Sequence, residues 1–324
     1  MSTKSQNNAA TQQNVTLQQD AGSSDMNKIE KNEGQWLQHA DHWYADGSLV
    51  LRVNKSLYKV HEGVLTRLAP NFFGGILSIP DGKEPGDPTR EGTELFPLLL
   101  EGVDIQRFED FLAWNYHSVP KTVLDDPFQK RRFFMNLLAI SDMWQIDTGR
   151  DTAITELEKM ALSPVERLEL AVKYSVPHWV DEAVKDIFAA KVTSLKDEDI
   201  ARLDCKVYSV LVKGAFMIET EIRRTAQVEP ATERDPDWRC MDHAKCCATW
   251  KRVWWEVIGR KLLHPDIPIS TDDIHWEVKK IHHKDISPQC MKDMVTEIES
   301  IVFVDKRIIA GVIEAILEFM GVGR

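Results

Sequence analysis

Cysteine and histidine are concentrated in one part of the chain. Residues 238–290 hold four of the five Cys, five of the ten His and five of the ten Trp. The densest cluster reads Cys240-x2-His243-x2-Cys246-Cys247. This spacing is close to that of zinc ligands, since zinc prefers thiolate and imidazole groups. If the cluster is helical, Cys240, His243 and Cys247 share one face, and His264 or Cys290 would supply a fourth ligand.

Hydrophobic spacing in the same stretch favours a different interpretation. Structural zinc sites normally pair two short Cys/His couples on tight turns, and only one couple is evident here. A helix would also carry an apolar stripe made of Trp250, Val253, Trp254, Val257, Ile258 and Leu262. We therefore expect buried free thiols with no metal and no cofactor. The residues to be tested as zinc candidates are Cys240, His243, Cys246 and Cys247.

His61 is a second residue whose position suggests a catalytic role. It follows a predicted strand, and a His in a cleft can act as a general base near neutral pH. No partner stands nearby in a triad arrangement, so a packed, hydrogen-bonded structural role is favoured. The sequence also lacks G-x-G-x-x-G, G-x-S-x-G and H-E-x-x-H motifs. We therefore predict that the protein is not an enzyme.

Basic and aromatic residues near the C-terminus raise nucleic acid as a partner. Trp side chains stack on bases where a basic groove holds the strand. Trp250 and Trp254, however, have the four-residue spacing of a buried helical face, beside a basic face that water solvates. The chain has 40 Lys and Arg against 51 Asp and Glu, a net charge of −11. Nucleic acid binding is therefore disfavoured.

Composition places the chain among globular proteins. It has 324 residues, of which 43% are hydrophobic and 28% charged, enough for about two domains. No apolar run is long enough to span a membrane, and the first 20 residues lack the apolar segment of a signal peptide. We therefore expect no membrane association and a cytoplasmic or nuclear location.

The predicted elements change character along the chain. Residues 1–34 are polar and low in complexity, which is typical of a disordered tail. Residues 47–54 and 57–60 alternate as strands do, with Asn54-Lys55 as a hairpin turn. Helices are expected at residues 62–68, 71–77 and 104–116, the last capped by Asp104, and a buried strand is expected at 94–100. After residue 128 helices are expected almost throughout, including one that starts at Ser163 and a final one over about 292–320. This order predicts an α+β fold followed by an all-helical region.

Three elements in order resemble the BTB/POZ family, in particular its fungal type. The first reads His61-x3-Leu65-x3-Ala69-Pro70-Asn71-Phe72, with Ala where the family has a capping Ser. The second runs through residues 98–116 and ends in the aromatic helix, and the third is residues 137–144, ending at Trp144. The resemblance implies a BTB/POZ-like domain at residues 35–147, a small sheet flanked by short helices. A BACK-like helical extension would follow at 148–226, and a helical Cys-, His- and Trp-rich region at 227–324.

The resemblance implies a protein–protein interaction module. Many such domains form homodimers, and some are adaptors that recruit a cullin scaffold for ubiquitin ligation, although no convincing cullin-contact motif is found here. The apolar strand and helix near residue 60 would form an edge suited to pairing across a two-fold axis. The interface candidates are Leu49, Leu51, Val64 and Leu68. The alternative is a transcription or chromatin regulator whose basic C-terminal region contacts DNA or zinc.

Overall fold

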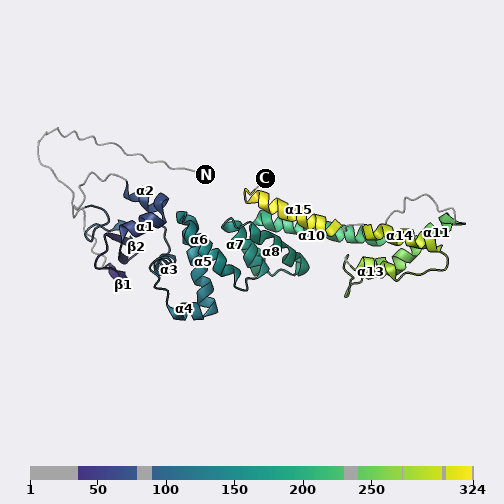
Figure 1. Cartoon of the computed structure of the whole chain (residues 1–324), viewed down its shortest axis with the longest axis horizontal. Helices are drawn as coiled ribbons and strands as arrows, with labels where there is room; N and C mark the ends of the chain where they lie inside the picture. Colours follow the sequence, from purple (N-terminus) through teal and green to yellow (C-terminus); the bar gives the residue numbers. More distant parts are fainter. Residues whose placement is uncertain (1–35, 79–89, 230–239, 272, 301–303, 323–324) are drawn as a thin grey trace, which may run out of the picture. The chain divides into compact units, whose positions relative to one another are not determined.

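The computed structural model describes residues 36–78, 90–229, 240–271, 273–300 and 304–322 (Figure 1). The expected tail at residues 1–34 lies outside this part of the chain. Two compact units are formed. The described part of the first comprises residues 36–61 and 90–101, and the second contains the other described residues.

A four-stranded sheet organises the first unit. Its strands are β1 (Leu37–Trp43), β2 (Leu49–Val53), β3 (Ser56–Val60) and β4 (Leu98–Leu99), in the order β1-β3-β2-β4. The expected hairpin is confirmed, since β2 and β3 are antiparallel with Val53 opposite Ser56. Asn54 has a φ of 53° in the two-residue turn, a conformation that Asn adopts more readily than most residues.

The outer strands depart from the expected pattern. β1 was not predicted, because its sequence LQHADHW is polar and mostly exposed and has no hydrophobic alternation. It runs parallel to β3, with irregular register between Gln38 and Trp43. The strand expected at 94–100 is shorter, since only Leu98–Leu99 pair with β2. Edge strands bury less side-chain area, so their sequences indicate them poorly.

Short helices open the second unit. They are α1 (Glu62–Leu68), η1 (Pro70–Gly74), α2 (Gly75–Leu77), α3 (Ile105–Asn115), α4 (Lys121–Asp125), α5 (Pro127–Trp144) and α6 (Asp147–Glu158). Asp104 caps α3 as expected, accepting a hydrogen bond from the Arg107 N–H, whereas Ala69 makes no side-chain cap at η1. The buried Trp144 ring stacks on Phe72 with centroids 4.8 Å apart.

The middle of the second unit is helical, as expected. Its elements are α7 (Pro164–Lys173), α8 (His178–Ala189), η2 (Val192–Ser194), α9 (Asp197–Arg202) and α10 (Cys205–Gln227). Ser163 caps α7 by accepting from the Glu166 N–H, which confirms the predicted helix start. Glu166 is buried and forms ion pairs with Arg131 and Arg202. These pairs compensate its charge.

The C-terminal helices complete the second unit. They are α11 (His243–Trp254), η3 (Trp255–Gly259), α12 (Arg260–Leu262), α13 (Ile274–Lys279), α14 (Pro288–Ser300) and α15 (Val304–Phe319). One helix was expected over 292–320. Two are observed, and residues 301–303 between them lie outside the described part. No described helix is long and apolar enough to cross a membrane.

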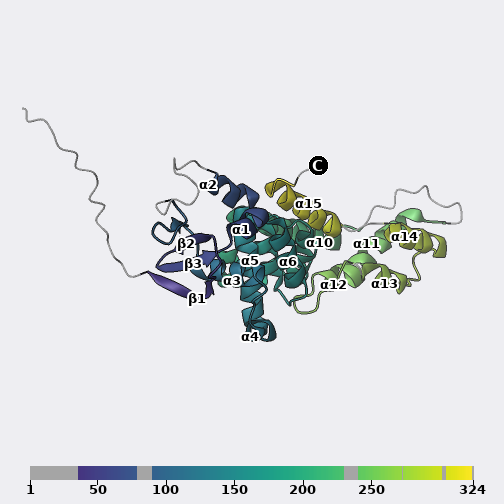
Figure 2. The same ribbon diagram turned by 60° about the vertical axis from the view of Figure 1, so that its left-hand side comes forward.

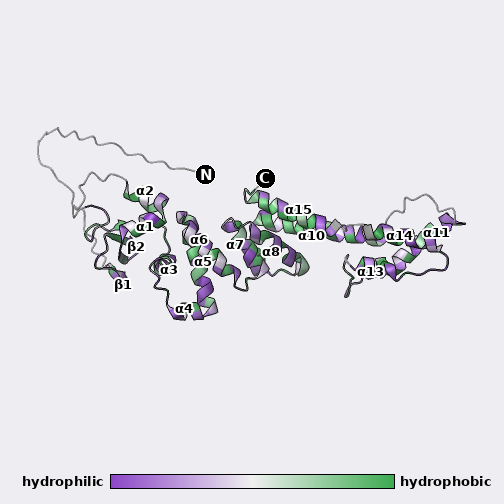
Figure 3. Ribbon diagram, in the orientation of Figure 1, coloured by the Kyte–Doolittle hydropathy of each residue, from purple (hydrophilic) through white to green (hydrophobic). Residues whose placement is uncertain are grey.

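Packing does not follow the expected boundaries at 147/148 and 226/227. α5 packs against α6 across the first boundary, and α15 packs on both α8 and α10 across the second. α10 and α15 lie side by side in both views (Figures 1 and 2). Figure 3 shows α15 as largely hydrophobic. The apolar stripe of this last helix is therefore buried against helices from the middle of the chain, which explains why they form one compact unit.

Candidate functional site

The interface candidates on the sheet are not surface residues. Leu49 is 2% exposed and Leu51 is fully buried, because β2 lies between β3 and β4. The expectation that this strand forms an apolar edge is therefore wrong. Val64 and Leu68 are half-buried on α1, and their part in an interface stays a prediction.

Exposed apolar side chains occur instead on the outer strands of the sheet. Leu37 at the start of β1 is 66% exposed and the adjoining Trp36 is 40% exposed. Leu99 of β4 is exposed as well, as are Leu95 and Phe96 just before it. The Arg52 guanidinium lies 4.8 Å from the centroid of the Trp36 ring, a cation–π contact that holds this exposed ring at the sheet. Both edges of the sheet thus present large hydrophobic groups.

His61 has the surroundings of a structural residue. Its Nε2 lies 3.3 Å from Oδ1 of the exposed Asp46. This contact lowers the pKa of the Asp46 carboxyl, chiefly through its hydrogen bond with His61. The Tyr44 ring lies 5.4 Å from the imidazole, centroid to centroid.

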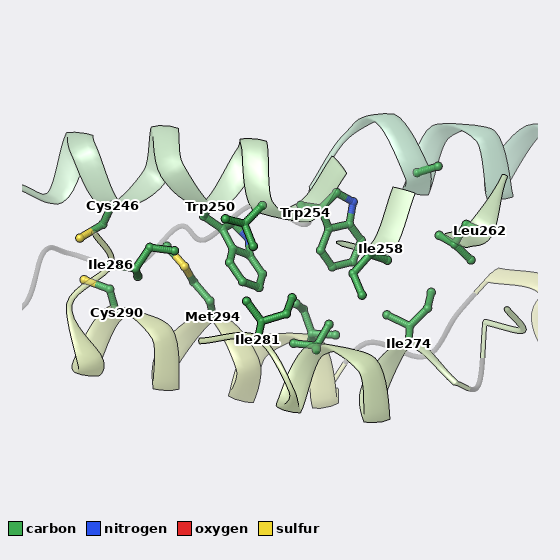
Figure 4. Packing of buried hydrophobic residues seen from close by; sticks show 14 residues of the cluster. Cys246, Trp250, Trp254, Ile258, Leu262, Ile274, Ile281, Ile286, Cys290 and Met294 are labelled. Carbon is green, nitrogen blue, oxygen red and sulfur yellow. The ribbon is translucent and has the colours of Figure 1, made fainter. Parts of the chain in front are cut away.

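Two helix starts bring cysteines and a histidine together in the second unit. Asp242 caps α11 by accepting from the Lys245 N–H at 2.9 Å, which places His243 in the first turn. Ser287 precedes α14, and its Oγ accepts from the Cys290 N–H at 3.2 Å. Because α11 and α14 pack through a shared apolar cluster, these first turns meet. Figure 4 shows Cys246 and Cys290 extending from the two facing helices at the same end of that cluster.

The distances within this cluster are short. The Sγ atoms of Cys240 and Cys246 are 3.6 Å apart, and Cys290 Sγ is 3.5 Å from His243 Nδ1. Cys247 Sγ lies 3.4 Å from the other ring nitrogen, Nε2. Among the described residues, Cys240, His243 and Cys290 can each offer a ligand atom within 4.8 Å of the other two. These groups can therefore hold a metal ion.

The expected arrangement of these ligands needs correction. Cys240, His243 and Cys247 do not share a helical face, because α11 begins at His243 and Cys240 lies before it. Of the two residues suggested as a fourth ligand, Cys290 joins the cluster. The other, His264, accepts hydrogen bonds at Nδ1 from the Asp266 and Ile267 N–H groups and is not in the group. The cysteines in the described residues form no disulfide.

The thiols differ in how they titrate. Burial raises the pKa of Cys290 to about 11. For Cys240, burial also acts to raise the pKa, but hydrogen bonds from the Cys290 and Cys246 thiols and the Asp242 backbone bring it below the ordinary value. Cys240 is thus the thiol of this pair that ionises more readily.

Two tryptophans of this region lie in the core. Trp250 and Trp254 are buried, and the Trp254 indole N–H donates to the Thr225 carbonyl at 2.8 Å. The predicted core role of this pair is therefore confirmed. Trp276 is exposed, with the Lys279 ammonium 5.3 Å from its ring centroid.

The second unit also contains a shallow pocket of about 380 Å³ beside α7 and the start of α10. Glu169, Arg202 and Asp204 are among its lining residues. Arg202 Nε donates to Glu169 Oε2 at 2.7 Å, so these two charges are already engaged with each other. The described lining provides no nucleophile held against a base.

The fold is mixed α+β, with a small four-stranded sheet and a predominantly helical second unit. No family model, curated protein or solved structure matches the chain.

Proposed function

We propose that this protein is a non-enzymatic interaction module that self-associates through its N-terminal sheet, as a BTB/POZ-like domain does. The observation that carries the proposal is β1, the outermost strand of the sheet among the described residues, where Leu37 is 66% exposed beside the exposed Trp36. The three family-like elements, which span residues 61–144, support the same class of function. The partner is a second copy of the chain.

The edge position of β1 provides the physical basis. An edge strand has a row of backbone N–H and C=O groups that another strand can pair with, and proteins usually protect such edges with charge or proline. Here the edge begins with a large exposed apolar side chain, Leu37, and the charged residue of the strand, Asp41, lies toward its other end. Covering exposed leucine and tryptophan with their symmetry equivalents across a two-fold axis removes apolar surface from water on both copies.

The test replaces the exposed leucine with a charged residue. Leu37→Glu should weaken self-association of the full-length protein at least about tenfold, because a buried unpaired carboxylate costs more than 1.4 kcal/mol. Sedimentation equilibrium across the micromolar range measures the change. Leu37 is exposed, so circular dichroism should show an unchanged fold.

Ile267→Glu is the matched control. Ile267 is 78% exposed in the second unit, so the same kind of charge there should leave the association constant unaltered. A wild-type chain that stays monomeric over the whole range contradicts the proposal, and so does an equal effect of the two substitutions.

An adaptor role toward a cullin scaffold is part of the same proposal and follows from the family resemblance. Capture of the full-length protein with and without Leu37→Glu, followed by detection of cullin, tests it. Recovery of cullin with the folded wild-type chain supports this role. Its absence restricts the proposal to self-association.

A further inference from the structure

We infer that Cys240, His243 and Cys290, whose ligand atoms lie within 4.8 Å of one another, form a structural zinc site of the Cys3His type, with His243 binding through Nδ1. The third sulfur is that of Cys246, which lies 3.6 Å from Cys240 Sγ but outside that group of three and moves toward it when the ion binds. The inference concerns the C-terminal helices and does not depend on the proposed self-association. It reverses the expectation of free thiols without metal, because the structure adds Cys290 to a set that had only one short Cys/His couple.

Two of the observed separations match those between ligands on a tetrahedral ion. With Zn–S bonds of about 2.3 Å and Zn–N bonds of about 2.0 Å, two sulfurs stand ~3.8 Å apart and a sulfur and a nitrogen ~3.5 Å apart. The Cys240–Cys246 distance is 3.6 Å, and the distance from Cys290 Sγ to His243 Nδ1 is 3.5 Å. Two opposite edges of the coordination tetrahedron are therefore already present.

The chemistry of the set favours zinc. Three sulfurs and one imidazole nitrogen match a structural zinc site, whereas magnesium and calcium require oxygen ligands. Cys246 and Cys290 are buried, and a bound divalent cation would compensate the charge of thiolates there.

Hydrogen bonds around the set orient the ligands. The Ser287 N–H donates to Cys246 Sγ at 3.3 Å. Cys247 lies 3.4 Å from His243 Nε2, on the side of the ring away from Nδ1. When Nδ1 binds metal, Nε2 carries the proton and donates it to this sulfur, which fixes the tautomer. Cys247 is therefore a positioning residue for His243 and not a fourth thiolate ligand.

The site joins parts of the chain that are distant in sequence. Cys240 precedes α11, His243 and Cys246 lie in its first turns, and Cys290 lies in α14, 47 residues after His243. The apolar cluster holds the helices along their length (Figure 4). Zinc would link the first turns of α11 and α14 to each other and to Cys240, which lies before α11 and outside any helix.

The test measures zinc in the full-length protein purified under reducing conditions. Elemental analysis should find one zinc per chain. Cobalt(II) exchanged into the site should give the intense visible bands of a tetrahedral ion and a thiolate-to-cobalt charge-transfer band. Cys240→Ser should raise the dissociation constant for zinc at least about tenfold. Cys240 is only half-buried before α11, so this variant should keep its fold.

Two serine variants are controls. Cys205→Ser changes an exposed thiol at the start of α10 and should leave one zinc bound. Cys247→Ser should also retain stoichiometric zinc, with weaker binding than wild type. Failure of the reduced wild-type chain to bind added zinc or cobalt overturns the inference. An equal loss of zinc in Cys247→Ser and Cys240→Ser also overturns it. A third contradicting result is a Cys240–Cys246 disulfide in protein purified without reductant, if the reduced protein then takes up no metal.

Discussion

His42 is a buried histidine on β1, only 5% exposed. Its backbone N–H donates to His39 Nδ1 at 3.2 Å, and the two imidazole rings stack with centroids 4.9 Å apart. Burial, and next the nearby His39, lower its pKa from 6.5 to about 4, although Asp41 acts in the opposite direction. The folded chain therefore holds this imidazole in its neutral form, and charging it disfavours the fold.

This lowered pKa predicts loss of stability in acid. Well above pH 6.5, the pKa of the unfolded chain, neither state protonates His42, so the imidazole does not weaken the fold. As the pH falls toward 4, the unfolded chain gains a proton that the folded chain does not, and the free energy of unfolding drops by up to about 3 kcal/mol. Urea titrations at several pH values, followed by circular dichroism, measure the drop.

The matched variants for this effect are His42→Gln and His282→Gln. A glutamine at position 42 cannot titrate, so the drop between pH 7 and pH 4 should become smaller even if the variant is less stable overall. His282 is exposed, and its replacement should leave the pH profile of wild type. Identical profiles for the wild type and His42→Gln would show that this imidazole is not responsible.

Helix packing at α10 depends on a residue without a side chain. A Cβ atom on Gly214 would lie 2.5 Å from Val312 Cγ2 and 3.0 Å from Phe188 Cζ. These atoms belong to α15, which packs on α10, and to α8, which packs on α15. Glycine costs about 1 kcal/mol in a helix relative to alanine, and here it allows the close approach of both neighbours.

Gly214→Ala should therefore destabilise the protein by roughly 1–3 kcal/mol, because overpacking outweighs the gain in helix propensity. The control is Gly311→Ala on α15, where a Cβ would meet nothing within 4 Å. That change should stabilise by about 0.5–1 kcal/mol. Urea unfolding of both variants gives the comparison. Stabilisation by both would mean that the contact at Gly214 relaxes without cost.

At the scale of the whole molecule, the two proposed surfaces lie on different compact units. The self-associating edge belongs to the sheet unit, and the thiol–imidazole cluster belongs to the helical unit. The residues proposed for self-association and those proposed to bind zinc belong to different units. The two properties should therefore be separable by mutation, as additive behaviour of distant sites implies.

This separation is tested by exchanging the measurements. Leu37→Glu should weaken self-association and still bind one zinc per chain, while Cys240→Ser should lose zinc and keep the wild-type association constant. Sedimentation equilibrium and elemental analysis on the same two preparations decide the matter. Loss of zinc in Leu37→Glu, or dissociation of Cys240→Ser, would show that the sites are coupled.

Local chemistry in the sequence determined much of the secondary structure. The hydroxyl of Ser163 and the carboxylate of Asp104 mark helix starts because each satisfies a backbone N–H within three residues. The turn at Asn54-Lys55 and the alternation around it likewise indicate the hairpin. The α+β class follows from the order of such elements.

Tertiary structure alone decided which of these residues are exposed and which meet. Whether β2 is central or an edge depends on β4, nearly fifty residues later, and the polar β1 has no hydrophobic pattern of its own. Cys290 reaches His243 because α14 packs on α11. Residue spacing predicts which side chains are close within one turn of helix or one strand. Contacts between distant segments depend instead on which apolar faces pack together to leave water.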